Sequence, residues 1–412
     1  MRADRVTSPR HPVLLFCPAV PLWRHAGGLL LDRKFHEGLR EYLRLWPGRI
    51  RLAMRVIDVD RWPSFGAVRI ADPAEDFDLV QLADNGSVRR EHLDGVDVVL
   101  ASADSHRNLR IARLCRANGV PCVHDIEYTL RTRLQMVRAE QGRGWARARS
   151  LAWLVLNEFR LRRALGAATS IQANGLPAFQ WYAQRKPGSM VYFDNRMTTS
   201  NCVADAGLEQ RLQHLASGAP LRLAFSGRLI RAKGADDLVS VARHLRALGV
   251  RFELHIFGTG ELEPQLAAAV AADALEGEVR LHGAVDFEHD LLPFIRSRID
   301  VFVCCHRQGD PSCTYLETYG CGVPIAGYAN EAHRSMLGHR DVGWQVPMGD
   351  ARGLAELICR LDSERALVAN KSRSALAFAR ENLSDRIFAQ RMAHCLAVAS
   401  SFDALTPGAV PA

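Results

Sequence analysis

Short apolar runs alternate with longer amphipathic stretches over nearly the whole chain. A short apolar run is typical of a buried strand, and apolar residues every three or four positions are typical of a helix. Strands that alternate with helices predict parallel sheets built from β-α-β units. In the first half the predicted strands are 12–17, 51–57, 96–102, 120–124 and 168–172, and the predicted helices are 29–45, 105–118, 145–165 and 177–184.

The pattern restarts at Leu221, after a polar segment without long apolar runs. The predicted strands are then 221–225, 252–257, 279–282, 299–304 and 323–326, the predicted helices are 234–248, 261–272, 287–296 and 313–320, and 351–400 is predicted helical with breaks near Asp362 and Asn382. We therefore predict an α/β protein of two similar domains, with ligands at the carboxyl ends of the strands of both. The expected boundaries are an N-terminal domain at 1–195, a linker at 196–220, a C-terminal domain at 221–383, and a last helix at 384–412 that returns to the first domain.

Size and composition agree with two globular domains. A chain of 412 residues exceeds one ordinary core, and 48% hydrophobic with 24% charged residues is a globular composition. The ten cysteines form no CxxC pair, which is typical of reduced thiols in the cytosol. Since no apolar run is long enough to cross a bilayer and no signal peptide is recognisable, we expect a cytoplasmic protein that is neither secreted nor membrane-spanning.

The net charge of +8 is concentrated in the segment 131–163. Nine arginines there are opposed by two glutamates, and the same segment contains Trp145 and Trp153 among several leucines. A basic helix with tryptophan and leucine on one side can lie on the surface of an anionic membrane, here on the cytoplasmic face. The alternative is a helix that packs on the core and exposes a solvated basic face. Binding of nucleic acid is disfavoured, because no recognition motif accompanies the charge.

A first candidate site follows the strand that begins at Leu221. The chain continues through Gly227 and Arg228, and Lys233 stands immediately before the next predicted helix. Arginine offers a planar pair of donors to phosphate oxygens, and lysine offers a point charge. Two cations at the carboxyl end of one strand therefore predict a site for a diphosphate, as in a sugar nucleotide.

A second candidate site lies eighty residues further along, between Gly309 and Glu317. We predict a helix start there, capped by Asp310 or Ser312, whose free backbone amides face an anion. Glu317 lies about one and a half turns into that helix, where its carboxylate can accept the two hydroxyls of a ribose. The residues predicted to bind the donor at this helix start are Asp310, Pro311, Ser312, Cys313 and Thr314.

These motifs resemble the donor domain of glycosyltransferase family 4, which has the GT-B fold. Arg228 and Lys233 match the diphosphate-binding element, and Glu317 with the run 320–324 matches the end of the element that binds the nucleotide sugar. Gly258 and Thr259 are similar to the glycine turn that lies near the nucleotide, and His282 is similar to a strand end that lies near the base.

The resemblance implies two Rossmann-like, doubly wound domains facing a central cleft. It also implies retaining transfer of a hexose-type sugar, without a metal or another cofactor, from a nucleoside-diphosphate sugar to a glycan or lipid-linked acceptor in the synthesis of a surface polysaccharide.

One position departs from the family pattern. The first glutamate of the family's paired carboxylates, which lies beside the transferred sugar, falls at Gly309, and Asp310 is one position late. Either Asp310 supplies the contact to the sugar through a shifted loop, or the contact is absent.

The first half offers weaker candidates. Gly27 and Gly28 are predicted between a strand and a helix, where paired glycines permit close approach of a diphosphate or sugar. His124 is predicted at a strand end, and the resemblance implies that it orients the donor sugar; the alternative is a histidine of the core. Two polar pairs after strands, at 174–175 and 195–196, are also predicted to face the cleft.

If the protein catalyses sugar transfer, we expect Arg228, Lys233 and the helix start to stabilise the departing diphosphate, and Glu317 to bind the ribose. Alternatives are an epimerase or hydrolase of nucleotide sugars on the same fold, or a homologue that binds the nucleotide without turnover. A nicotinamide-dependent dehydrogenase is disfavoured, because no GxGxxG follows the first strand.

Overall fold

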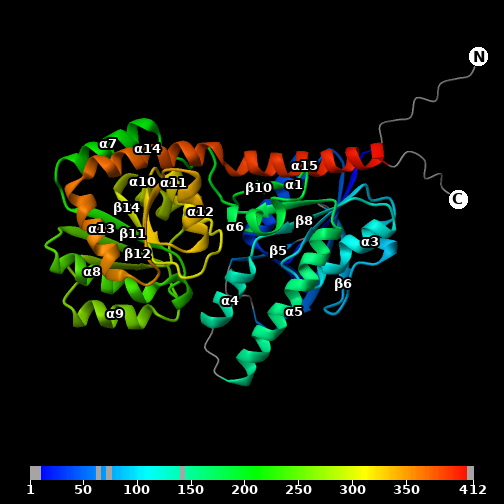
Figure 1. Cartoon of the computed structure of the whole chain (residues 1–412), viewed down its shortest axis with the longest axis horizontal. Helices are drawn as coiled ribbons and strands as arrows, with labels where there is room; N and C mark the ends of the chain where they lie inside the picture. Colours follow the sequence, from blue (N-terminus) through cyan, green and yellow to red (C-terminus); the bar gives the residue numbers. More distant parts are fainter. Residues whose placement is uncertain (1–10, 62–65, 71–76, 140–143, 406–412) are drawn as a thin grey trace, which may run out of the picture.

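The structure, a computed structural model, describes residues 11–61, 66–70, 77–139 and 144–405. Each of two α/β domains is built around one sheet, and the two lie side by side in Figure 1. Within these described ranges the N-terminal sheet has ten strands: β1 Val13–Cys17, β2 Leu22–His25, β3 Gly28–Asp32, β4 Arg49–Asp58, β5 Ala67–Ile70, β6 Asp78–Leu82, β7 Val98–Ser102, β8 Cys122–Ile126, β9 Ser170–Asn174 and β10 Met190–Tyr192. Its helices are α1 Arg33–Leu45, α3 Ile111–Ala117, α4 Leu130–Ala139, α5 Trp145–Ala167 and α6 Leu176–Ala178.

The C-terminal sheet is entirely parallel, in the order β13-β12-β11-β14-β15-β16. Its strands are β11 Leu221–Ser226, β12 Phe252–Phe257, β13 Val279–Gly283, β14 Val301–Cys304, β15 Ile325–Tyr328 and β16 Gly343–Val346. The helices around it are α7 Asp205–Ala216, α8 Leu238–Ala247, α9 Glu263–Ala272, α10 Leu292–Arg298, α11 Thr314–Gly320, α12 Glu331–His339, α13 Ala351–Ser363 and α14 Arg365–Glu381, and α15 Ser384–Leu405 follows. Strands that are buried on both faces explain the continuous apolar runs of this half of the sequence.

The segment predicted as a helix from Leu29 begins instead as a strand. β2 and β3 form an antiparallel hairpin, and the two residues between them, Ala26 and Gly27, have φ angles of 47° and 75°. Two positive φ angles in a two-residue loop are the type I′ hairpin turn. The helix α1 starts only at Arg33, with the Asp32 carboxylate accepting the backbone N–H of Phe35 at 2.9 Å. The predicted strand-to-helix loop at Gly27 and Gly28 is therefore wrong, and both glycines lie near the β3–β5 edge of the sheet.

The segment predicted as a linker, 196–220, belongs largely to the C-terminal domain. It contains α7, whose Leu208, Leu212 and Leu215 are buried in the core of that domain. Arg211 on the same helix is 3% exposed, and its guanidinium donates to the carbonyls of Arg296, Cys321 and Gly322. These bonds connect α7 to α10 and to the chain just beyond α11.

Replacing Arg211 by alanine is expected to lower the free energy of unfolding by roughly 2–3 kcal/mol, because buried carbonyls lose a charged donor. Urea denaturation followed by circular dichroism measures this loss. Glu209→Ala on the same helix is the control, since Glu209 forms a half-exposed ion pair with Arg373 and should change stability by less than about 0.5 kcal/mol. Equal stability of the two variants would contradict the role given to Arg211.

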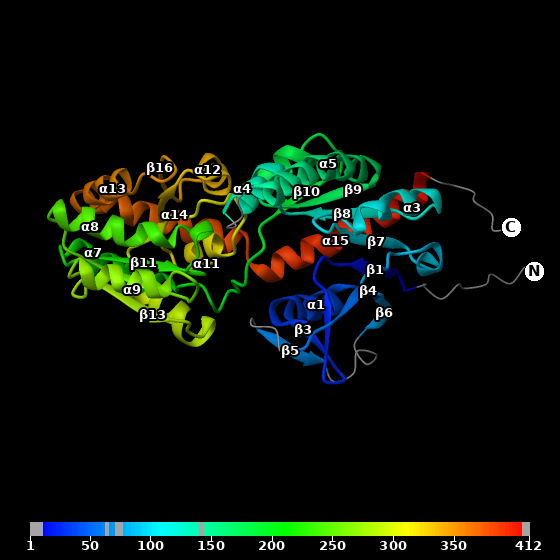
Figure 2. The same cartoon turned by 90° about the horizontal axis from the view of Figure 1, so that it is seen from below.

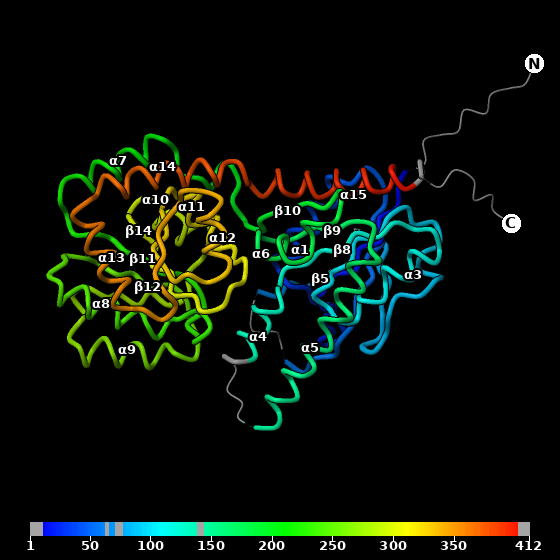
Figure 3. Tube along the Cα trace, viewed as in Figure 1, coloured from blue at the N-terminus to red at the C-terminus, as the bar shows by residue number. Residues whose placement is uncertain are grey.

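The last helix, α15, lies against the N-terminal domain. Figure 3 shows the trace passing from α14 into α15 and along that domain. Met392 and Cys395 are buried in its core, and Arg391 donates to Gln172 Oε1 at 2.7 Å and stacks 4.1 Å above the ring of Tyr192.

The two domains touch through loops at the carboxyl ends of their strands. Glu331, at the start of α12, accepts hydrogen bonds from Thr129 Oγ1 at 2.8 Å and Trp181 Nε1 at 2.9 Å. The backbone N–H of Gly309 donates to Gln135 Oε1 at 3.0 Å. Loops that follow β8, β9 and β10 therefore face the loops that follow β14 and β15.

No helix in the described ranges has both the length and the apolar content needed to cross a bilayer.

Candidate functional site

The residues predicted to bind a donor gather at one edge of the C-terminal sheet. Gly227, Arg228 and Lys233 follow β11, and Gly258 and Thr259 follow β12. His282 is the last residue but one of β13, and the segment 310–317 follows β14. Since β13, β12, β11 and β14 are parallel neighbours, their carboxyl ends lie together. Adjacent strands lie about 5 Å apart, so these loops share one surface.

The loops after β11 and β12 are in backbone contact. Gly258 has a φ of +117°, and a Cβ placed on it would lie 2.0 Å from the carbonyl oxygen of Gly227. The Thr259 carbonyl accepts the backbone N–H of Leu229 at 2.9 Å. Glycine at position 258 thus allows the two strand ends to approach, and this contact places the loop that carries Arg228. The Arg228 side chain is exposed and pairs with no carboxylate of the described residues.

Lys233 is buried and paired. Its Nζ lies 3.0 Å from Asp310 Oδ2 and 3.4 Å from Oδ1, and both residues are less than a tenth exposed. A lysine ammonium has three donors, so the pair with Asp310 leaves it donors for a phosphate oxygen. The structure thereby joins the two predicted motifs, and it makes Asp310 the partner of the lysine.

Glu317 is also paired. Its Oε1 lies 2.8 Å from Arg196 Nε and its Oε2 lies 3.2 Å from Nη2, a bidentate contact. The guanidinium of Arg196 stacks 3.5 Å above the ring of Phe287. A ribose that binds Glu317 must share this carboxylate with Arg196 or displace the arginine.

The start of α11 faces the N-terminal domain. A Cβ on Gly175 would meet Pro311 at 2.8 Å, and Lys34 Nζ donates to Cys313 Sγ at 2.9 Å. Ser312 Oγ lies 3.2 Å from Thr314 Oγ1. The helix begins at Thr314, one residue later than predicted, and ends at Gly320. Its N-cap is Cys313, so the predicted cap by Asp310 or Ser312 is wrong.

Lys34 is a charged group at this junction that the sequence did not indicate. Its Nζ lies 2.5 Å from Asp194 Oδ2, at the end of β10, as well as against Cys313. Burial alone lowers the pKa of Lys34, but Asp194 and Cys313 raise it well above its ordinary value, so the amine is charged. The sequence did not predict that Lys34 lies on the first turn of α1, because the predicted helix began at Leu29.

Glu127 joins the same junction from the end of β8. Burial, and after it the nearby carboxylates Asp104, Asp194 and Asp310, raise the pKa of its carboxyl to about 8, although Lys34 opposes the rise. Its backbone N–H donates to Asp104 Oδ2 at 2.7 Å. A proton therefore sits on Glu127 at neutral pH in the folded protein.

This proton predicts a pH-dependent stability. The folded pKa of Glu127, about 8, exceeds the ordinary value of 4.5, so the folded state holds the proton more tightly than the unfolded state. Its stabilising effect is complete below pH 4.5 and is lost as pH rises to about 8. Glu127→Gln should therefore gain thermal stability over wild type progressively across this window. Calorimetry at several pH values measures the difference, and exposed Glu276→Gln is the control; a constant difference for Glu127→Gln would contradict the raised pKa.

His124 lies in the core and not in the candidate site. It is fully buried in the middle of β8, its Nδ1 lies 2.8 Å from the Ala101 carbonyl, and burial lowers its pKa to about 4. The strand continues for two residues beyond it, which places the histidine below the carboxyl edge. The predicted role for His124 in orienting the sugar is not supported by this position.

His282, by contrast, lies at the predicted strand end and is exposed. Its ring stacks on Phe257 with centroids 4.3 Å apart, and its Nε2 lies 3.0 Å from His255 Nδ1. The stack fixes the ring beside the loop after β12.

Gly309 has no room for a side chain. A Cβ there would lie 2.8 Å from the Cβ of Glu331 and 3.2 Å from its backbone nitrogen. The position of the family's first glutamate is thus occupied by the start of α12.

Comparisons with known proteins find matches to the C-terminal domain, which carries these residues. Residues 220–364 match the family described as "Glycosyl transferases group 1". The chain is 28% identical over 183 residues to the amylovoran biosynthesis glycosyltransferase AmsK of Erwinia amylovora, a match that covers 43% of this chain and 44% of that protein. It is 27% identical over 184 residues to the 2-deoxystreptamine N-acetyl-D-glucosaminyltransferase of Streptomyces fradiae, covering 44% of this chain and 42% of that protein. The chain thus matches less than half the length of these relatives.

Solved structures show the same fold over nearly the whole chain. HepE of Anabaena, solved in complex with UDP, has a TM-score of 0.65 at 13% identity, with 94% of this chain and 99% of that chain covered. Sucrose-phosphate synthase of Thermosynechococcus elongatus has a TM-score of 0.63 at 16% identity, with 96% of this chain and 100% of that chain covered. Residues 220–364 therefore form a domain of the group 1 glycosyl transferases, within a chain that has the GT-B fold.

Proposed function

We propose that this protein is a retaining glycosyltransferase that moves a hexose-type sugar from a nucleoside-diphosphate sugar to a glycan or lipid-linked acceptor in surface polysaccharide synthesis. The observation that carries the proposal is that Arg228, Lys233 and Glu317 follow neighbouring strands at one edge of the sheet, opposite the loops of a second domain. The relative from Erwinia amylovora is named for amylovoran biosynthesis, and HepE was solved in complex with UDP.

In the proposed reaction the bond between the anomeric carbon and the diphosphate breaks, and the acceptor oxygen bonds to the same face of the sugar. The leaving diphosphate takes the acceptor proton. Arg228 and Lys233 would stabilise the negative charge that develops on the departing oxygen, which is an effect of fixed charges in a partly dry site. No step of this route requires a metal or another cofactor, and we propose that transfer persists in a chelator.

Thermal-shift measurements with UDP, GDP, ADP and NAD test the donor class, because a bound ligand raises the melting temperature. A nucleoside diphosphate is expected to stabilise the protein, and NAD is not. Release of nucleoside diphosphate is then assayed with a lipid-extract acceptor pool, with and without a chelator, and the product anomer is identified by NMR. An inverted anomer would contradict retention, and free sugar or an epimer without acceptor would favour the hydrolase or epimerase.

Glu317→Ala is expected to weaken nucleotide binding by about tenfold, because a carboxylate that accepts ribose hydroxyls is lost. Calorimetric titration with the nucleoside diphosphate and with inorganic pyrophosphate separates the effects. Affinity for pyrophosphate should be retained. Equal loss for both ligands would place Glu317 outside the ribose contact.

We also propose that the protein works in the cytoplasm at the inner face of an anionic membrane. The arginine-rich segment 131–163 supports this placement, and a lipid-linked acceptor would reside there.

A further inference from the structure

The helix α5 carries large apolar side chains on both of its faces. Its inward side chains, Leu154, Leu161 and Leu165, are buried in the domain. Its outward side chains include Trp145, which is 91% exposed, and the exposed residues Trp153, Val155, Leu156 and Phe159. Five of the nine large apolar side chains that are exposed in the described part of the chain thus lie on this one helix. Such a concentration marks a surface that contacts something apolar.

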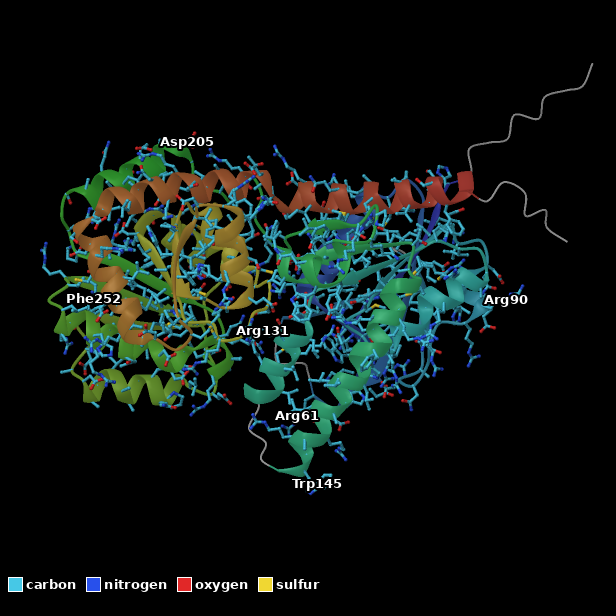
Figure 4. All side chains as sticks on the ribbon, viewed as in Figure 1. Arg61, Arg90, Arg131, Trp145, Asp205 and Phe252 are labelled. Carbon is cyan, nitrogen blue, oxygen red and sulfur yellow. The ribbon has the colours of Figure 1, made fainter. Side chains whose placement is uncertain are left out.

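The outward apolar residues form a strip along the helix. Trp145 and Leu156 are separated by eleven positions, which is about three turns, and Phe159 follows one turn later, so all three lie on the same side. Figure 4 shows Trp145 at the free end of α5, away from the bodies of both domains. Figure 2 shows α5 at the outer surface of the N-terminal domain, with α4 beside it on the side of the C-terminal domain.

A basic pocket continues the strip at the other end of the helix. Arg163 of α5 and Arg113 and Arg116 of α3 line a shallow pocket of about 530 Å³, whose remaining walls are Ala117, Gly166 and Ala167. None of these three arginines pairs with a carboxylate in the ranges that the structure describes. Arg163 follows Trp145 by eighteen positions, or five turns, so it lies on the same side about 27 Å along the axis.

Two other arginines of the segment 131–163 form ion pairs within the domain. Arg133 pairs with Asp104 at 2.9 Å, and Arg162 pairs with Glu158 at 2.7 Å and stacks near the ring of Trp181. Charge for an external partner therefore comes from α3 as well as α5, which the sequence run alone did not indicate.

We infer that the outward strip of α5 and the pocket of Arg113, Arg116 and Arg163 form one surface that docks on an anionic lipid bilayer, with a lipid phosphate held in the pocket. Tryptophan, leucine and phenylalanine enter the boundary between headgroups and acyl chains, while arginine forks bind phosphate oxygens. A second copy of the chain is disfavoured as the occupant, because symmetric contact would bring unopposed arginines together. The inference depends on the proposed function in one respect only, namely that a lipid-linked acceptor is located at the membrane.

Cosedimentation with vesicles tests this surface in the full-length protein. Wild type should bind vesicles that contain phosphatidylglycerol and bind pure phosphatidylcholine weakly. The variant Arg113→Gln/Arg116→Gln/Arg163→Gln should bind the anionic vesicles about a hundredfold more weakly, because each charge near such a surface contributes about a factor of five. The variant Trp145→Ser/Leu156→Ser/Phe159→Ser should lose binding to the same vesicles.

Two matched controls come from the C-terminal domain. Arg243→Gln/Arg280→Gln/Arg352→Gln removes the same charge, and Leu248→Ser/Met348→Ser removes exposed apolar side chains. Both should stay within about threefold of wild type, since distant exposed charges are screened. Equal loss in the arginine control, or no binding by wild type, would overturn the inference. A third result would also overturn it: pyrophosphate at matched ionic strength displaces the protein from vesicles, and the apolar substitutions do not change vesicle binding. That result would indicate a site for soluble anions.

The thermal shift with nucleoside diphosphates distinguishes this inference from the proposed function. Every surface variant should keep the wild-type shift. A protein that binds the nucleotide but no vesicle refutes the docking surface alone, whereas one that binds vesicles but no nucleotide refutes the sugar-transfer proposal alone.

Discussion

Replacement of Lys233 by methionine is expected to lower the rate of sugar transfer by a factor of about 10²–10³, the usual effect of removing one fixed charge from the leaving group. Lys233 can exert this effect because it is buried, and a charge that is shielded from water interacts more strongly with a phosphate than an exposed one. Nucleoside diphosphate release under saturating donor measures the rate. A variant with wild-type turnover would remove Lys233 from the proposed mechanism.

The same substitution carries a second effect that must be separated from the first. Asp310 lies 3.0 Å from Lys233 and is itself buried, so the methionine variant leaves a carboxylate without its cation. Loss of one partner of a buried pair costs about 3 kcal/mol. Lys233→Met/Asp310→Asn removes the uncompensated charge, so it should recover most of the stability but none of the transfer. Recovery of both would mean that the single variant failed through folding.

Arg228 supplies an independent comparison. Its side chain is exposed and has no carboxylate partner among the described residues, so Arg228→Ala should leave the unfolding free energy within about 0.5 kcal/mol of wild type. Its transfer rate should still fall by about 10²-fold if the arginine contacts the departing diphosphate. Substitution of Lys233 should therefore lower both the stability and the transfer rate, whereas substitution of Arg228 should lower only the transfer rate.

The strands of the C-terminal domain could be predicted from the sequence, together with the candidate site residues that follow them. The predicted strand 252–257 coincides with β12, and the strands at 221–225 and 279–282 end within one residue of β11 and β13. Strands that are buried on both faces appear as unbroken apolar runs, so their ends, and the polar residues after them, can be read from the sequence.

The N-terminal hairpin could not be read in this way. Leu29, Leu30 and Leu31 are compatible with a strand or with the first turn of a helix, and periodicity cannot separate the two over three residues. The positive φ of Ala26 also hides the turn, because alanine rarely occupies that conformation. The error moved the start of α1 and concealed Lys34.

Pairing across the chain is the second limit. Glu317 and Arg196 are 121 positions apart, and Glu331 meets residues of the other domain 150 and 202 positions away. Sequence spacing predicted that Glu317 lies on a helix near a strand end. It could not predict the ion pair between Glu317 and Arg196, because that pair depends on the tertiary structure. The position of His124 has the same cause, since the two residues by which β8 extends beyond it depend on pairing with β7 and β9.

The position of Gly309 leads to the last expected result. Gly309→Glu restores the residue type that the family carries, yet it should lower the unfolding free energy by about 3 kcal/mol and reduce transfer. Its Cβ would lie 2.8 Å from the Cβ of Glu331, and overpacking of this kind costs about 1–3 kcal/mol before a second carboxylate is added beside the first. The shift of Glu331 would also disturb the hydrogen bonds that it accepts from Thr129 and Trp181.

Two further variants separate the steric effect of Gly309→Glu from the role of a carboxylate beside the sugar: Gly309→Ala and Asp310→Asn. Gly309→Ala introduces the same close contact without charge, so it should reproduce a large part of the stability loss. Asp310→Asn tests whether the aspartate contacts the sugar, through the ratio of the dissociation constants for the nucleotide sugar and the nucleoside diphosphate. Because Asp310 faces Lys233, this ratio should match wild type within about twofold, equivalent to about 0.4 kcal/mol. A ratio of dissociation constants ten times that of wild type would indicate that Asp310 contacts the sugar. Faster transfer by Gly309→Glu would contradict the expected clash with α12, because it would show that α12 can move to accept the added carboxylate.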